Sequence, residues 1–199
     1  MHTLSLAIAE ACTARGWISA QDTPWCAYAV ENKLISICFF LLLIPLALFL
    51  NVLPEAAIFS CIFYLLRRRY GGWHAPYAWL CQIISIALVL ATTLLIGPAI
   101  LQLPLSLVCG INAVIMIIAI LQPPVYPPQL HFDQKIKCAN TKKKNHILLI
   151  VLTFQIGFSF FFRNVLVYSL LAVLAGVSSV YIEILQQQIY RKEGSYEET

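Results

Sequence analysis

Residues 34–51 read LISICFFLLLIPLALFLN, a stretch without a single charged side chain. An apolar run of about 18 to 20 residues is long enough for a helix to cross the hydrocarbon core of a bilayer. Five further apolar segments follow it along the chain, at 54–66, 77–96, 104–122, 146–162 and 164–186. We therefore predict an all-α fold, a polytopic membrane bundle of about six transmembrane helices.

The composition indicates the same class of protein. Of the 199 residues, 60% are hydrophobic and only 11% are charged, which is far from the balance of a soluble domain. We predict a single membrane domain with an N-terminal interfacial region at 1–33, a transmembrane bundle at 34–190 and a short cytoplasmic tail at 191–199. In the first region Leu4 and Ile8 recur at helical spacing, which predicts an amphipathic helix lying in the membrane surface.

The breaks between the apolar segments predict the connections. Gly97-Pro98 and Pro104 predict a tight turn between two helices, because proline lacks the backbone N–H that a continuing helix needs. The long connection at 123–145 begins Pro-rich and ends lysine-rich, and we predict a loop there.

Charge predicts the orientation. If all six segments cross, every one of the 13 lysines and arginines except Arg163 falls on one side. The positive-inside rule makes that side cytoplasmic, together with both termini. Segment 54–66 leaves an alternative open, because its length of about 20 Å is short of a bilayer core. The helix could extend through Arg69, or it could be re-entrant, which would place the N-terminus outside.

The seven cysteines do not predict a disulfide framework or a metal site. Their number is odd, there is no C-x-x-C pair, and no His/Cys cluster has zinc spacing. We predict neither a metal nor a cofactor. Cys38, Cys61 and Cys109 lie among aliphatic residues in the middle of apolar segments, which predicts that they are core packing residues.

Polar chemistry is concentrated at residues 67–82, RRRYGGWHAPYAWLCQ. In an unbroken helix His74 and Cys81 would lie about 10 Å apart along the axis, too far for a proton transfer. Gly71-Gly72 and Pro76 supply the freedom for the histidine to fold back over the start of the next helix. An imidazole there could take the proton of Cys81 and generate a nucleophilic thiolate. The spacing of His74 and Cys81 alone is equally consistent with a structural role, in which both are packing residues beside a belt of aromatic side chains at the membrane interface.

The pattern R-x(4)-G-x-H-x(6)-C, formed by Arg67, Gly72, His74 and Cys81 at the start of an apolar segment, resembles the accessory gene regulator B (AgrB) family. The likeness covers roughly residues 31–190. It implies a membrane cysteine endopeptidase of bacterial quorum sensing, with Cys81 as nucleophile, His74 as base and the active site on the cytoplasmic side of the cell membrane. It further implies a small precursor peptide with an acidic C-terminal tail (AgrD-like), cyclisation to a thiolactone or lactone, and a homodimer.

Two basic clusters lie on the predicted cytoplasmic face. They comprise Arg67, Arg68 and Arg69 at the end of one apolar segment, and Lys142, Lys143 and Lys144 before another. They could hold the acidic tail of a peptide substrate, and anionic lipid headgroups are an equally good fit for the same charges. We predict no nucleic-acid partner, because the basic runs are short and tethered to the bilayer. The alternative function is a non-catalytic transporter or scaffold, although the chain lacks the matched halves typical of a transporter.

Overall fold

The computed structural model describes the chain except residues 1, 74–77, 126–133, 160–161 and 198–199. Its described residues form helices, joined by short connections and one isolated bridge between Gly71 and Val125. The chain divides into two compact units. One comprises Met1–Asn51 with Pro76–Ile86, and the other comprises Val52–Ala75 with Ala87–Thr199.

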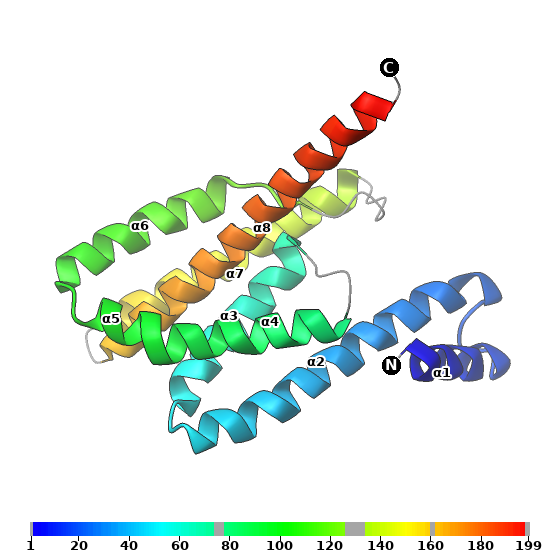
Figure 1. Ribbon diagram of the computed structural model, residues 1–199, viewed down its shortest axis with the longest axis horizontal. Helices are drawn as coiled ribbons and strands as arrows, with labels where there is room; N and C mark the ends of the chain where they lie inside the picture. The colour runs from blue at the N-terminus through cyan, green and yellow to red at the C-terminus, as the bar shows by residue number, and fades with distance from the viewer. Residues whose placement is uncertain (1, 74–77, 126–133, 160–161, 198–199) are drawn as a thin grey trace. The chain divides into compact units, whose positions relative to one another are not determined.

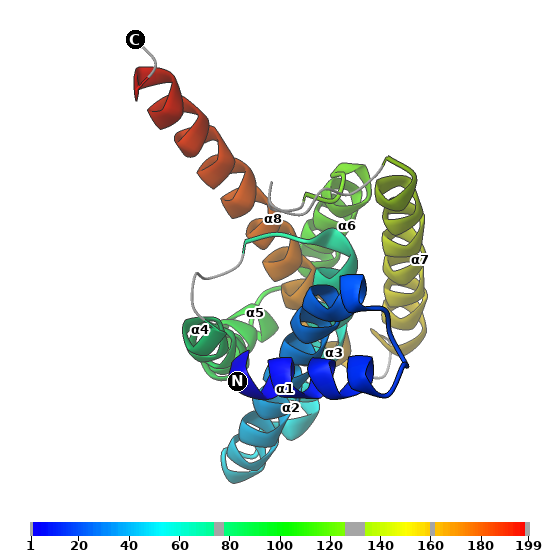
Figure 2. The same ribbon diagram turned by 90° about the vertical axis from the view of Figure 1, so that its right-hand side faces the viewer.

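In the first unit, helix α1 (His2–Ala14) folds back against helix α2 (Thr23–Phe49) (Figure 2). The buried face of α1 is built of small residues, since Ser5 and Ala9 are fully buried while Leu4 and Ile8 are exposed. Helix α2 starts with Pro24 in its first turn, where a missing N–H costs nothing, and it runs without a break into the apolar stretch. The surface location of α1 stays a prediction.

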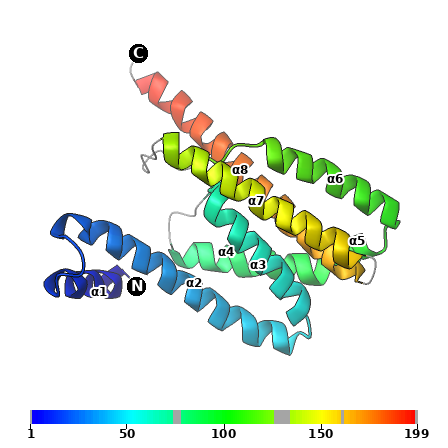
Figure 3. The same cartoon turned by 180° about the vertical axis from the view of Figure 1, so that it is seen from behind.

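The second unit is arranged around helix α8 (Arg163–Glu197) (Figure 1). In its apolar span at Arg163–Ile189, 72% of the most apolar window is buried, compared with 12% for Ala20–Phe49 in the other unit. Seen from behind, helix α3 (Leu53–Tyr70) and helix α7 (Gln134–Ser159) lie together against α8 (Figure 3). Helix α6 (Leu105–Leu121) also packs on α8, which is therefore the core of this unit.

Buried polar side chains tie three of these helices together. Asn112 of α6 and Gln155 of α7 exchange hydrogen bonds at 3.0 and 3.2 Å, and Gln155 also donates to the Ser169 hydroxyl of α8 at 2.8 Å. Because unpaired amides are costly in an apolar interior, this network fixes the relative rotation of α6, α7 and α8.

The turn predicted from Gly97-Pro98 with Pro104 is confirmed at Pro104, where α6 begins, and is wrong at Gly97-Pro98. Helix α4 (Ala78–Ala91) continues through a π-helical stretch (Thr92–Ile96) into helix α5 (Gly97–Leu101), and the chain turns only after Leu101. The wider π-helical turn accommodates the proline, since the Gly97 N–H bonds to the Thr92 carbonyl and the Thr93 hydroxyl donates to the Val89 carbonyl.

Two other boundaries differ from the sequence-based expectation. The lysine-rich end of the predicted loop 123–145 is helical, because α7 begins at Gln134 and no glycine or proline interrupts it before Gly157. Helix α3 extends beyond segment 54–66 through the arginines to Tyr70, which confirms the predicted extension of the helix, whereas its crossing of the membrane stays a prediction. At about 27 Å it is comparable with a bilayer core.

Three described helices are long and apolar enough to cross a membrane, at Ala20–Phe49, Trp79–Leu101 and Arg163–Ile189. The all-helical fold and the membrane class are thus confirmed, whereas six crossings and their orientation stay predictions.

Candidate active site

Two glycines form the exit from α3. Gly71 and Gly72 have φ angles of 75° and 99°, a region that residues with a side chain rarely adopt. The Gly71 N–H still bonds to the Arg67 carbonyl at 3.1 Å, so the helix closes its last turn before the backbone turns away. The chain therefore leaves α3 in a direction that only glycine permits, immediately before Trp73 and His74.

Helix α8 holds this exit through Ser179. The Trp73 N–H donates to the Ser179 carbonyl at 3.0 Å, and the Arg67 guanidinium donates to the Ser179 hydroxyl at 3.0 Å and to the Trp73 carbonyl. A Cβ atom on Gly72 would lie 2.4 Å from the Ser179 Oγ and 3.1 Å from its carbonyl carbon. The absence of a side chain at residue 72 is thus what allows the backbone to lie directly on α8.

The segment after α6 holds the same exit from another direction. The Val125 N–H donates to the Tyr70 carbonyl, and the Gly72 N–H donates to the Val125 carbonyl, both at 3.0 Å. Residues 70–73, which we call the glycine exit, are thus hydrogen-bonded to α8 and to Val125. The local backbone before His74 is fixed by four backbone–backbone hydrogen bonds, by the Arg67 guanidinium that donates to the Trp73 carbonyl, and by the close approach of Gly72 to Ser179.

Cys81 is the fourth described residue of α4 and is half-buried. The amide of its neighbour Gln82 donates to the Ile35 carbonyl of α2, which fixes this end of α4 within the first unit. His74 and Pro76 lie outside the described residues. Their relation to Cys81 stays a prediction.

All seven cysteines are free thiols. The prediction that Cys61 and Cys109 are core packing residues is wrong, because both side chains are exposed on the surface of their helices. Apolar neighbours along the sequence do not distinguish the core of a membrane protein from its lipid-facing surface, since both are apolar. Among the described residues, no group of three or more His, Cys, Asp or Glu side chains is placed to hold a metal ion.

The six basic residues of the two predicted clusters have different surroundings. Arg68, Lys142 and Lys143 are exposed. Arg69 donates to the Asn140 side chain at 3.3 Å, which joins the end of α3 to the first turns of α7. Arg67 bonds to Ser179 and Trp73, and Lys144 is completely buried. Three of the six charges are therefore free to face a solute, and Arg67, Arg69 and Lys144 bond to neighbouring elements of the fold.

The contributions of Ser179, Tyr70 and Val125 were not predicted from the sequence. Serine 179 lies in a run of small residues, which indicates close packing without identifying the partner. Val125 follows Gln122 and the Pro123-Pro124 pair, so only the end of a helix could be predicted at this point.

These features define a helical integral membrane protein with an anchored glycine exit directly before a histidine, and a free cysteine at the start of the next helix. The chain belongs to the Accessory gene regulator B (AgrB) family, which it matches over residues 8–186.

The chain is also similar to the protein FsrB of Enterococcus faecalis (strain ATCC 47077 / OG1RF). The two are 29% identical over 82 residues, which cover 41% of this chain and 34% of FsrB. The alignment thus spans about a third of the length of that curated relative. No solved structure matches the chain.

Proposed function

We propose that the protein is a membrane cysteine endopeptidase that removes the C-terminal tail of a quorum-sensing precursor peptide and promotes cyclisation of the remainder. The observation that carries this proposal is the sequence motif formed by Arg67, Gly72, His74 and Cys81 in a chain of the AgrB family. Two motif residues, Arg67 and Gly72, contact Ser179. These contacts anchor the backbone that leads to His74, the next residue of the motif.

In the proposed first step, His74 takes the proton of the Cys81 thiol and the thiolate attacks a peptide carbonyl carbon. The carbon–sulfur bond forms while the carbon–nitrogen bond breaks. The imidazolium returns the proton to the departing amine of the tail, so the charges balance. The remainder of the peptide is left as a thioester on Cys81.

In the proposed second step, a cysteine thiol or serine hydroxyl of the bound peptide attacks the thioester while His74 takes its proton. A new thioester or ester closes the ring, the carbon–sulfur bond to Cys81 breaks, and the imidazolium returns the proton to the departing Cys81 sulfur. Exchange of one thioester for another keeps the acyl group activated, whereas hydrolysis by water would release the linear peptide instead. A half-buried cysteine at the start of a membrane helix suits this reaction, because water has limited access to it.

We propose that the exposed side chains of Arg68, Lys142 and Lys143 bind the acidic tail of the precursor. The hydrogen bond from Arg69 to Asn140 brings the end of α3 beside the first turns of α7, so the two sets of charges belong to neighbouring elements. Anionic lipid headgroups compete for the same charges in the proposed membrane setting. We also propose that the protein forms a homodimer, and this part of the proposal rests only on its family membership.

Replacing these three residues together by glutamine should raise the KM for an acidic-tailed precursor about fivefold, because exposed ion pairs contribute roughly 0.2–1 kcal/mol each. The value of kcat should be unchanged. The measurement is cleavage by protein reconstituted in vesicles of neutral lipid at low and high salt, and the difference from wild type should shrink with salt. A KM equal to that of wild type at low salt would remove the tail-binding assignment and leave the catalytic pair untouched.

The proposal places both termini and the basic clusters in the cytoplasm, with six crossings. Cys138 is exposed on α7 beside these clusters, so it reports their side of the membrane. A membrane-impermeant thiol reagent added to intact cells should leave Cys138 unlabelled and should label it after lysis. A cysteine introduced at Glu31 should behave in the same way. Labelling of Cys138 before lysis would reverse the orientation, and labelling of residue 31 alone would mean that α3 does not cross.

The function itself is tested with purified protein in vesicles and a labelled synthetic precursor that carries a helical leader, a Cys- or Ser-containing core and an acidic tail. Mass spectrometry should find the free tail and a cyclic product lighter by the mass of water than the linear leader-core fragment. Intact precursor after prolonged incubation with correctly inserted protein would contradict the peptidase function.

A further inference from the structure

Lys144 is the only lysine among the described side chains that is fully buried, with no exposed surface. Its ammonium nitrogen lies 2.8 Å from the Ala119 carbonyl oxygen, 3.0 Å from that of Ile120 and 2.6 Å from that of Gln122. An ammonium group has three N–H donors, so each of them has an acceptor.

The sequence explains why these carbonyls need a donor from outside the helix. In a continuing helix the N–H groups of residues 123 and 124 would bond to the carbonyls of Ala119 and Ile120. Both residues are prolines and have no N–H. Lys144 replaces the missing donors, and its positive charge lies at the negative end of the helix dipole of α6.

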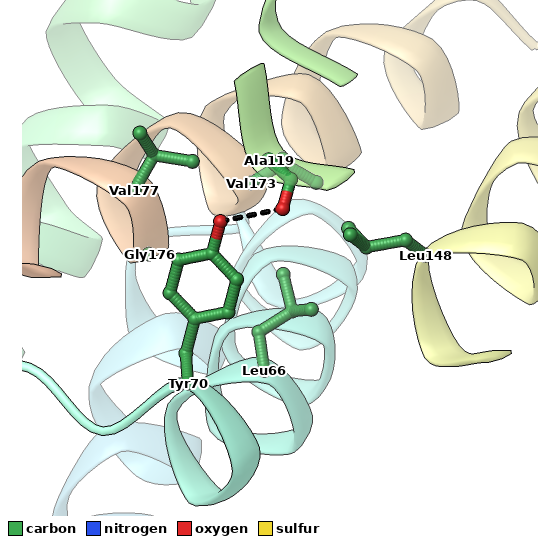
Figure 4. A pocket seen from close by; sticks show the side chains of 7 residues that line it. All are labelled: Leu66, Tyr70, Ala119, Leu148, Val173, Gly176 and Val177. Atoms are coloured by element: carbon green, nitrogen blue, oxygen red, sulfur yellow. Dashed lines mark hydrogen bonds between the residues drawn. The ribbon is translucent and has the colours of Figure 1, made fainter. Parts of the chain in front are cut away.

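Tyr70 connects this buried cation to the glycine exit. The Lys144 nitrogen lies 4.9 Å from the centre of the Tyr70 ring, and the Tyr70 hydroxyl donates to the Ala119 carbonyl at 2.7 Å. Figure 4 shows the ring enclosed by Leu66, Val173 and other apolar side chains, with its hydroxyl directed at Ala119. The enclosure has no space for a water molecule. The carbonyl of the same Tyr70 accepts the Val125 N–H.

We propose that Lys144 is a positioning residue, which holds the end of α6 and Val125 against Tyr70 and thereby fixes the glycine exit that precedes His74. This inference rests on the proposed peptidase function and assigns Lys144 no contact with the substrate. Burial lowers the pKa of the ammonium group to about 8, so at pH 7 most molecules still carry the proton that completes the three bonds.

The test compares Lys144→Met with Lys137→Met, since Lys137 lies on the same helix and is exposed, so both variants lose one charge from α7. Lys144→Met removes all three donors at nearly constant side-chain volume. Deuterium uptake at residues 68–73 and at the amides of Gln122 and Val125 should increase at least tenfold in rate in Lys144→Met, while uptake in α1 and α2 should equal that of wild type. In vesicles, kcat should fall at least tenfold with the KM for the precursor unchanged. Lys137→Met should match wild type in deuterium uptake and in kcat.

Other outcomes discriminate between the explanations. Wild-type deuterium uptake in Lys144→Met would overturn the inference, and so would faster uptake with wild-type kcat. A raised KM with unchanged kcat would assign Lys144 to direct tail binding instead. If Lys144→Met does not accumulate in membranes, the same measurements are made on Lys144→Gln. This variant retains two N–H donors on a shorter side chain. If wild-type protein cleaves no precursor, the peptidase function fails, and deuterium uptake alone decides whether Lys144 fixes the exit.

Discussion

Replacing Cys81 by alanine should abolish cleavage of the precursor, with a loss of roughly 10⁴-fold or more, because no other group supplies the proposed nucleophile. Membrane insertion and thermal stability should remain close to wild type, since Cys81 is half-buried and forms no disulfide. Cleavage is measured in vesicles by release of the labelled tail. His74→Ala should cause a comparable loss, because the thiol would then lack its base.

The control variants are Cys61→Ala and Cys109→Ala, which remove exposed thiols from helices of the second unit. Both should retain wild-type cleavage. If Cys81→Ala releases the tail at the wild-type rate, the peptidase assignment is wrong, and residues 67–82 form a basic and aromatic membrane-interface segment.

Gly72→Ala should be the most damaging single change outside the proposed catalytic pair. The new methyl group would lie 2.4 Å from the Ser179 Oγ, and the φ angle of 99° is unfavourable for alanine. Residue 72 must therefore move away from α8, which breaks its bond to Val125 and displaces the backbone before His74. A displacement of about 1 Å can reduce catalysis roughly 100-fold. We expect a fall in kcat of this size for protein that is still inserted in the membrane.

Gly176→Ala is the matched control for this substitution. Gly176 also lies on buried α8 surface facing α3, but its added Cβ would be 3.8 Å from the nearest atoms of Leu66, an ordinary contact. Alanine is also favoured over glycine inside a helix by about 1 kcal/mol. This variant should be active and slightly more stable to heat. Equal activity of Gly72→Ala and Gly176→Ala would show that the close approach to Ser179 has no functional importance.

The apolar periodicity was sufficient to predict the helical fold, because burial in lipid requires that backbone groups bond within helices. It placed the helix boundaries less well. Proline marked the end of α6 at Pro123 correctly, yet Pro98 lies in a helix that continues past it. The difference is that the helix changes to π-helical geometry at Thr92–Ile96, directly before Gly97-Pro98, and a single sequence does not reveal such a change.

For the candidate site, the sequence was informative about which residues carry chemistry and uninformative about which of them are buried. Lys142, Lys143 and Lys144 are indistinguishable as a run of charge, although only the third is buried among carbonyl acceptors. The double proline at 123–124 does predict carbonyls that lack donors. What it does not predict is that a lysine twenty residues later supplies them, because this contact depends on how α6 and α7 pack.

The central claim is that the peptide is held on Cys81 as a thioester between cleavage and cyclisation. It is tested most directly by quenching wild-type protein with acid during turnover of a precursor whose core Cys or Ser is replaced by alanine, which prevents ring closure. Intact-protein mass spectrometry should then find an adduct with the mass of the leader-core fragment less one water, located on Cys81 and removed by hydroxylamine. Release of the tail without any such adduct on the protein would contradict the account.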